Sequence, residues 1–465
     1  MLTYQDFIAE TNKAAFINQA IREHIASEMY KTAKIADEYD RHKNVTINEY
    51  TKVIYNLHGT AMEDYIAANN KIASNFFRRL NTQRCTYSLG NGVSFSDHLE
   101  KGTDEEGNEI TIDTTKKRLG NRFDTDLKKT GYKALIHGVC FGYWAVNRLH
   151  VFPITEFKPI WDEDTGILRV GIRFWRLDEQ KPMIAVLYEE DGYTKYSSKD
   201  GSSFKVVVPK KKYQQTISHT VADGDIIVGE SNYGSLPIVP LWGSDLHQST
   251  LIGMRESIDS YDLIRSGFVN DLEDVSQVYW ILENYGGMKD SDLQRFRNKI
   301  KRMHIAEVDT SAGGKITPYT QEIPHEAREK CLAGLRAGIY EDFGALDVHT
   351  VAAGATNDHI DAAYQPMDEN ADDFEFQVIE FVQQILKLIG IEDTPVFKRN
   401  RISNQSEQTQ MVLLAADHLD TETILSKLPF ISVDEIPKIL ARRDAESHDR
   451  LEDTEDNTEK EVMPQ

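Results

Sequence analysis

The spacing of the apolar residues changes twice along the chain, and these changes limit the possible fold more than any other feature of the sequence. From Asp6 to Tyr39 most apolar residues recur three or four positions apart, as on one face of an amphipathic helix. The same spacing predicts helices over Thr46–Leu57, Ala61–Leu80 and Asp113–His137. The first part of the chain is therefore expected to be helical.

The middle of the chain has the composition and alternation of β-strands. Runs rich in β-branched and aromatic residues at Phe157–Trp161 and Ile167–Trp175 flank the turn Asp162–Gly166, which predicts a hairpin. A second hairpin is predicted from Met183–Tyr188 and Tyr193–Tyr196, with an acidic turn that ends in glycine. Further strands are expected at Tyr143–Phe152, Phe204–Val208 and Tyr213–His219.

The last half returns to helical spacing, with a small insertion between two long helices. Leu251–Gln277 has a stripe of apolar residues along one face and, at about 1.5 Å per residue, is roughly 35–40 Å long. The second helix, Pro324–Phe343, begins with a proline, which the first turn of a helix accepts. The insertion is predicted to contain a strand, a basic helix and two more strands, at Val278–Glu283, Asp290–Met303, Ile305–Asp309 and Lys315–Thr320.

A loop and several helices are expected after the second long helix. Val348–His359 is rich in small and polar residues and is interpreted as a loop, whereas Ala371–Ile389 is a helix that Gly390 ends. Short helices are predicted at Glu407–Leu419, Thr421–Leu428 and Val433–Arg443, before an acidic tail that is expected to be disordered.

The charge and the cysteines limit the class of protein. The formal net charge is −22, which is unusual for a protein that grips DNA, because such grip depends on Lys and Arg. It suits a soluble protein, or a surface that DNA must pass without sticking. Cys85, Cys140 and Cys331 are widely spaced and odd in number, which argues against a disulfide framework and for a reducing compartment. The start of the chain shows no secretory signal, and no apolar run is long enough for a membrane span.

No motif with an established catalytic mechanism is present. Gly90-Asn91-Gly92 is too short for a phosphate loop, and the Asp162–Gly166 turn lacks the downstream glutamate of a calcium loop. Asp358-His359 and Asp417-His418 place carboxylates beside histidine, but no second histidine stands at the spacing of a metal ligand. The sequence therefore predicts no catalytic residue, no metal site and no cofactor.

One cluster of positive charge stands out in this acidic chain. Its members lie in and just before the predicted helix Asp290–Met303: Lys289, Arg295, Arg297, Lys299, Lys301 and Arg302. Two interpretations remain open at this point. The cluster is either a solvated helix face, as charge runs usually are, or a contact for nucleic acid or an acidic partner.

The order of these parts, and several short motifs, resemble the portal proteins of tailed bacteriophages, in particular the portal family typified by siphophages of Gram-positive hosts. The similarity extends over roughly residues 45–440 in colinear order. The motifs are Asn70–Arg78 followed by Tyr87–Val93, Lys133–Tyr143, Pro159–Asp162 with Ile172–Phe174, Gly234–Pro240 and Ile258–Asp262. Two places depart from the family pattern: Gly92 replaces a proline, and Ala353–Asp358 fits the tunnel segment only loosely.

The resemblance implies an α+β, mainly helical subunit with a wing, a two-helix stem, a small α/β clip and a helical crown. The implied wing is 1–250, with stem helices at 251–277 and 324–343 around a clip at 278–323. A tunnel loop and wing helix at 344–394, a crown at 395–447 and an acidic tail at 448–465 complete the subunit.

The resemblance also implies a role and partners. The protein would be a dodecameric ring at one vertex of the capsid, assembled in the bacterial cytoplasm, and would catalyse nothing itself. Double-stranded DNA would pass through it, and it would meet the terminase large subunit, the major capsid protein, scaffold and a head–tail adaptor, but no membrane. The clip cluster would contact terminase or DNA, and the implied tunnel-loop residues are Val348, His349, Thr350, Thr356, Asn357 and His359. The alternative left open is a metal-dependent nucleic-acid enzyme.

Overall fold

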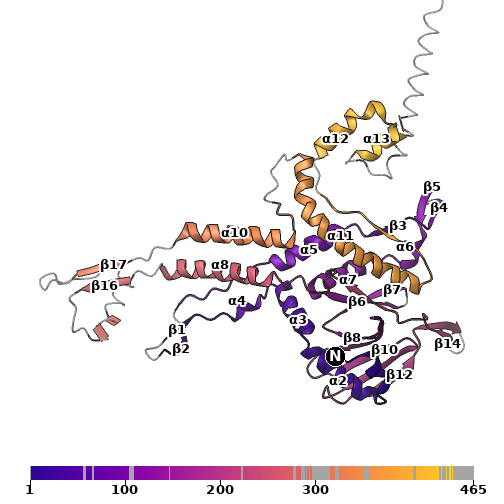
Figure 1. Cartoon of the computed structure of the whole chain (residues 1–465), viewed down its shortest axis with the longest axis horizontal. Helices are drawn as coiled ribbons and strands as arrows, with labels where there is room; N and C mark the ends of the chain where they lie inside the picture. Colours follow the sequence, from indigo (N-terminus) through magenta and orange to yellow (C-terminus); the bar gives the residue numbers. More distant parts are fainter. Residues whose placement is uncertain are drawn as a thin grey trace, which may run out of the picture.

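Two α-helices leave a body of helices and antiparallel sheets and run side by side as a long arm (Figure 1). The computed structural model describes residues 2–55, 59–64, 67–103, 109–145, 147–220, 224–275, 279–283, 289, 291–292, 294–295, 315–319, 324–348, 356–401, 405–428, 431, 436, 439–440 and 442–443. These residues combine helices with antiparallel strand pairs, so the predicted mixture of helix and strand is confirmed.

The larger sheet of the body has five antiparallel strands in the order β12-β11-β10-β9-β8. Both predicted hairpins lie in it, and the chain turns between β8 and β9 where Asp162 accepts the Asp164 N–H at 3.1 Å. Helix α2 (Lys13–Ala26) packs against this sheet through apolar side chains that include Phe16 and Ile17. The strands are β8 (Phe157–Trp161), β9 (Leu168–Trp175), β10 (Met183–Glu189), β11 (Gly192–Ser198) and β12 (Lys205–Lys211).

A smaller sheet, in the order β15-β6-β7, forms the centre of the body with three helices around it. Its strands are β6 (Val139–Ala145), β7 (Arg148–Pro153) and β15 (Ile238–Trp242), and the helices are α5 (Phe76–Leu89), α7 (Phe123–His137) and α11 (Asn357–Leu388). Gly142 is required on β6 because a Cβ there would lie 2.4 Å from the ring of Phe381 on α11. This close approach fixes the second half of α11 against the sheet.

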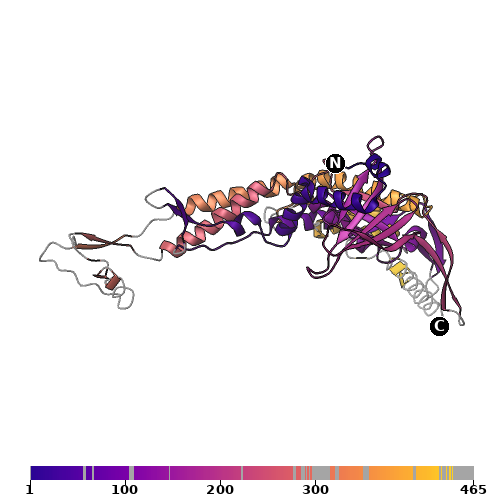
Figure 2. The same cartoon turned by 90° about the horizontal axis from the view of Figure 1, so that it is seen from below.

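The arm consists of helices α8 (Arg255–Val275) and α10 (His325–Phe343) with the hairpin β16 (Tyr279–Glu283) and β17 (Lys315–Tyr319) beyond them. Figures 1 and 2 show the two helices together from both directions, with the hairpin at the end far from the body. The two long helices and the two strands are confirmed close to their predicted bounds. The predicted strand Ile305–Asp309 and most of the predicted helix Asp290–Met303 lie outside the described residues.

The helices of the first 80 residues were predicted too long. Asp6–Tyr39 forms α1 (Tyr4–Ala9), α2 and α3 (Glu28–Asp40), because the side chains of Asn12 and Ser27 accept backbone N–H groups and start new helices. The predicted helices Thr46–Leu57 and Ala61–Leu80 are wrong. This part of the chain holds α4 (Val45–Glu49), the hairpin β1 (Val53–Tyr55) and β2 (Ala61–Glu63), and the start of α5.

Two further predictions need correction. Asp113–His137 is α6 (Thr114–Leu119) and α7, separated at Gly120 with a φ of 86°, a conformation that glycine adopts without strain. Tyr143–Phe152 is not one strand, since β6 turns at Asn147 into β7.

The remaining described elements are short. They are β3 (Val93–Phe95), β4 (Leu99–Thr103), β5 (Glu109–Asp113), β13 (Gln214–Thr220), β14 (Gly224–Ser231), β18 (Pro395–Phe397), α12 (Gln405–Leu414), η2 (Ala416–His418) and α13 (Thr421–Lys427). Most of the predicted helix Val433–Arg443 and all of the acidic tail lie outside the described residues. None of the described helices has the length and apolar character that a membrane span needs.

Candidate functional site

Helix α8 buries a line of polar side chains, and the chain segment before α5 runs along that line. The backbone N–H groups of Asn70, Ile72 and Ser74 donate to Asn270, Ser266 and Asp262 on α8, at 2.6, 3.0 and 2.9 Å. These three acceptors stand four residues apart on one face and are at most 5% exposed. The side chains of α8 therefore accept the backbone N–H groups of a segment that was predicted to be helical, and these hydrogen bonds hold the segment in an extended conformation.

Asp262 lies at the most deeply buried position of this contact. Its carboxylate is fully buried and also accepts a hydrogen bond from Asn44. Burial raises the pKa of Asp262 above its usual range, and the hydrogen bonds from Asn44 and Ser74 only partly oppose this effect. One turn earlier, Asp259 accepts hydrogen bonds from Tyr39 and Thr46, so two carboxylates tie the root of the arm to the first helices.

The two helices of the arm meet through mixed contacts. Phe268 on α8 packs edge-on against His325 at 5.7 Å and lies 5.6 Å under the guanidinium of Arg328. Arg328 also forms an ion pair of 2.5 Å with Asp271. In this single chain Phe268 stays half-buried, and Leu272, on the predicted apolar stripe, is 46% exposed.

The joint between the arm and α11 is capped by one side chain. Asn370 on α11 donates to the carbonyl of Phe343, the last residue of α10, at 3.4 Å, and to that of Pro366 at 3.0 Å. Gly344 ends α10 with a φ of 61°, in the left-handed region that favours glycine. Pro366 itself lies inside α11, where proline removes a helical hydrogen bond.

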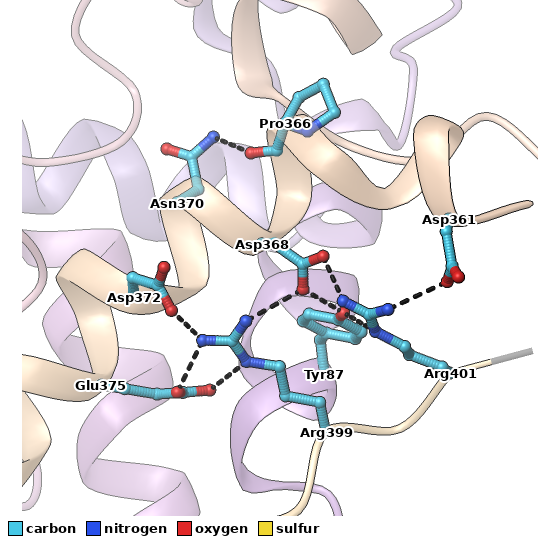
Figure 3. A network of polar contacts seen from close by, with 9 residues as sticks. All are labelled: Tyr87, Asp361, Pro366, Asp368, Asn370, Asp372, Glu375, Arg399 and Arg401. Atoms are coloured by element: carbon cyan, nitrogen blue, oxygen red, sulfur yellow. Dashed lines mark hydrogen bonds and ion pairs between the residues drawn. The ribbon is translucent and has the colours of Figure 1, made fainter. Parts of the chain in front are cut away.

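Two arginines that follow β18 bind a row of acids on α11 (Figure 3). Arg399 donates to Asp368 at 3.0 Å, to Asp372, and to both oxygens of Glu375 at 3.1 and 2.9 Å. Arg401 donates to Asp361 at 3.0 Å, to Asp368, and to the Tyr87 hydroxyl at 2.8 Å. The segment after β18 is thus fastened to α11 by charge-assisted hydrogen bonds, which are stronger than neutral ones.

The network changes the acidity of two of its members. Burial raises the pKa of Tyr87 to about 12, and the hydrogen bond that its hydroxyl donates to Asp368 at 2.6 Å acts in the same direction. Although burial raises the pKa of Asp368, hydrogen bonds from Tyr87 and the two arginines outweigh it and hold that pKa below its usual range. The sequence interpretation missed this network, because its hydrogen-bonded partners are 24 residues or more apart and no motif connects them.

The predicted clip cluster is only partly within the described residues. Lys289 and Arg295 are exposed, and Arg297, Lys299, Lys301 and Arg302 lie outside the described part of the chain. The structure therefore leaves the role of the cluster as a prediction.

The predicted tunnel-loop residues are divided in the same way. Val348 is exposed after α10, and His349 and Thr350 lie outside the described residues. Thr356 is the N-cap of α11, and its hydroxyl lies 3.0 Å from Nδ1 of His359. The expected loop is too long at this end, because Asn357 and His359 belong to the first turn of α11. The sequence prediction had begun this helix only at Ala371, after Pro366.

The pairs of carboxylate and histidine do not form a larger cluster in the part of the chain that is described. Within it, no group of three or more His, Cys, Asp or Glu residues could hold a metal ion. His418 lies in η2, and His359 makes the contact with Thr356. Burial raises the pKa of the Cys85 and Cys140 thiols to about 12, whereas Cys331 is exposed on α10.

Comparison with known proteins identifies the family. Residues 19–449 match the family described as phage portal protein, SPP1 Gp6-like. The chain belongs to this family of phage portal proteins. Its function is that of a portal, the connector between the head and the tail of a phage particle.

Individual portal proteins are similar over most of their length. The portal protein of Clostridium phage phiCD119 is 25% identical over 402 residues, which cover 80% of this chain and 84% of that protein. The portal protein of Bacillus phage SPP1 is 22% identical over 420 residues, covering 83% and 78%. A solved structure described as the neck of a native GTA particle, computed with C12 symmetry, aligns with a TM-score of 0.39 and 10% identity. That alignment covers 76% of this chain and 89% of the other.

The family assignment gives the portal elements a context. Phage portal proteins are structural components of the virion. We therefore interpret the line of buried polar side chains on α8 and the network of Arg399 and Arg401 as contacts that stabilise the fold. Family membership also decides between the two functions that the sequence left open, in favour of the portal.

Proposed function

We propose that twelve copies of this portal protein form a closed ring at one vertex of the capsid, and that double-stranded DNA passes through its channel during packaging and ejection. The observation that carries this proposal is the arm: two paired helices project from the body and hold a hairpin at their far end (Figure 2). A projecting pair with half-buried apolar residues gains further burial when identical copies stand side by side in a ring.

In this proposal the parts of the chain have separate tasks. The body up to residue 250 is the wing, and α8 and α10 are the stem, within the ranges 251–277 and 324–343. Residues 278–323, which include β16 and β17, are the clip. Residues 344–394 supply a tunnel loop and a wing helix, in which α11 is the wing helix, and 395–447 form the crown with α12 and α13.

The charge of the chain suits a channel. A ring of subunits that each carry a net charge of −22 repels phosphates, which lowers the adhesion of DNA to the wall. Screening limits this repulsion to about 8–10 Å from the surface at ordinary ionic strength.

The basic cluster of the clip would be the docking surface. In the proposed ring, copies of Lys289, Arg295, Arg297, Lys299, Lys301 and Arg302 form a cationic collar at one mouth of an acidic tube. Such a collar attracts an acidic surface of the terminase large subunit or of an adaptor, or guides the entering DNA end. Attraction of this kind raises the association rate and weakens with salt. The major capsid protein and the scaffold would surround the wing during assembly in the bacterial cytoplasm.

The experiment that tests the ring is a measurement of size. Light scattering and electron microscopy of the purified full-length protein should show a large ring of about twelve subunits, since rotational symmetry closes such assemblies. A protein that stays a monomer or dimer at all concentrations contradicts the proposal.

The docking surface has its own test. Reversal of Arg295, Arg297, Lys299 and Arg302 to Glu should leave ring formation intact and strongly reduce DNA packaging into procapsids. Full packaging by this variant would show that the cluster is a solvated face. A matched control reverses Lys205 and Lys211 on β12, basic residues outside the clip, and should package normally.

A further inference from the structure

Proline divides helix α11 into two parts that make different contacts. We call residues 357–365 the first arm of α11 and residues 367–388 its second arm. The second arm packs on the central sheet through fully buried residues such as Phe374 and Phe381. The first arm has only a small cluster, in which Tyr364 stacks on Tyr87 at 5.6 Å. Figure 1 shows that α11 changes direction along its length.

A helix is weak at such a point. Pro366 has no N–H group for the carbonyl one turn earlier, and helices that contain proline bend there. The angle between the two arms is therefore set by contacts outside the helical backbone.

Arg401 makes contacts on both sides of the proline (Figure 3). It pairs with Asp361 on the first arm at 3.0 Å and with Asp368 on the second arm, and its Nε donates to Tyr87 on α5. Its guanidinium also lies 5.6 Å from the ring centre of Tyr364. Arg399, two residues earlier, pairs with Asp368, Asp372 and Glu375, all on the second arm.

We propose that Arg401 is a positioning residue that fixes the direction of the first arm of α11, and so couples the segment after β18 to the end of α11 that follows the stem. The coupling itself stands on the contacts alone. In the proposed function the first arm follows the tunnel loop, and the segment after β18 belongs to the crown. That the contact links the crown to the end of the tunnel loop therefore rests on the proposed function.

The exposed fractions of the acidic side chains show which ion pair of Arg401 is the weaker one. The Asp361 side chain is 65% exposed, whereas those of Asp368 and Glu375 are 20% and 12% exposed. Exposed ion pairs are weak and are screened by salt, and partly buried ones are screened less. The tie to the first arm is therefore the one that releases first, while both arginines stay bound to the second arm.

Hydrogen exchange of the full-length protein, followed by mass spectrometry, tests the assignment. In Arg401→Gln the amides of the first arm should exchange about tenfold faster, the size expected from the loss of charge-assisted hydrogen bonds. Asp361→Asn removes the ion-pair partner on the first arm, leaves the contact between Arg401 and Tyr364, and should give a smaller increase, roughly threefold, because exposed pairs are weak. The double variant should be no faster than Arg401→Gln, since the two residues act through one contact.

Arg399→Gln is the matched control, because it removes an arginine of the same network whose ion pairs on α11 are all with the second arm. The guanidinium of Arg399 lies 6.0 Å from the ring centre of Tyr87 on α5. The variant should speed exchange around residues 368–375 and leave the first arm unchanged. At about 1 M salt the screening length is only about 3 Å. The difference in first-arm exchange rate between Arg401→Gln and the natural protein should therefore become smaller. Arg401→Lys, which keeps the charge but not the three-way geometry, should restore part of the protection.

Two results would overturn the proposal. One is first-arm exchange in Arg401→Gln no faster than in Arg399→Gln. The other is equal acceleration of both arms by both variants, which would indicate a general loss of stability. Because exchange is read on the chain whether or not it packages DNA, this test stands apart from the packaging and size measurements. A failure to form rings would contradict the proposed function and leave the exchange comparison valid.

Discussion

The body and the arm are stabilised by different kinds of contact. In the body, Phe374, Val378 and Phe381 of α11 are fully buried against the small sheet, and Phe381 reaches the backbone of Gly142. In the arm, α8 buries a line of polar groups and leaves Phe268 only half-buried. The body therefore has a complete core within one chain. The arm has hydrogen bonds that hold it in place, but apolar surface that neighbouring copies would cover in the proposed ring.

The largest difference should be in stability. Phe381→Ala removes a fully buried ring from the core and should lower the free energy of unfolding by about 3–5 kcal/mol. Phe268→Ala, the same change in the arm, should cost about 1 kcal/mol or less in the unassembled chain, because a half-exposed ring gives up less burial. Urea unfolding of the two variants measures both values. Equal losses would show that the arm is packed as tightly as the body.

The cysteines give the second contrast. Cys85 and Cys140 are buried in the body with the pKa of each thiol at about 12, whereas Cys331 is exposed on the arm. A thiol reagent should modify Cys331 at least about 100-fold faster than the other two, because only an accessible thiolate reacts. Peptide mapping after timed alkylation gives the three rates, with Cys331→Ser as the control. Rapid modification of Cys140 would mean that the body opens more readily than its packing indicates.

The two regions should also respond in opposite ways to acid. The pKa of Asp368 is lowered in the folded body, so its contribution to stability is present above the ordinary carboxyl pKa and is lost as the pH falls through the lowered one. The pKa of Asp262 in the arm is raised, so its unfavourable charge is relieved as the pH falls through that raised value.

Unfolding of Asp368→Asn and Asp262→Asn across the acidic range separates these effects. On acidification, the free energy of unfolding of the natural protein should fall relative to that of Asp368→Asn. Over the same range it should rise relative to that of Asp262→Asn. Parallel curves for both variants would contradict the opposite shifts.

The smallest effect concerns the ion pair between the two helices of the arm, α8 and α10. The Arg328 and Asp271 side chains are 27% and 38% exposed, and pairs of this kind contribute about 0.2–1 kcal/mol. Arg328→Gln should lower the stability of the arm by no more than that, and the loss should shrink at about 1 M salt. Hydrogen exchange of α8 and α10 measures it. A loss that is independent of salt would point to the contact with Phe268 in place of the charge.

Sequence patterns predicted those elements whose signal is local. The hairpins around Asp162–Gly166 and between β10 and β11 were found because alternation and turn residues lie within one short stretch. The long helices α8 and α10 were found from their apolar spacing. The network of Arg399 and Arg401 was not found, because Tyr87 meets Arg401 across 314 residues of sequence. The portal family was recognised from the order of the parts and several short motifs, none of which identifies the family alone.

The sequence by itself determined the alternation of helical and stranded blocks, the acidic charge and the paired long helices, since these follow from residue type and spacing. The tertiary structure alone decided the path of residues 70–74, whose helical spacing was misleading. Their N–H groups find acceptors on α8, and a backbone group satisfied in this way does not need a helix. It also decided that α11 continues past Pro366, because Arg401, Asn370 and the cluster around Tyr364 hold both sides of a bend that proline favours.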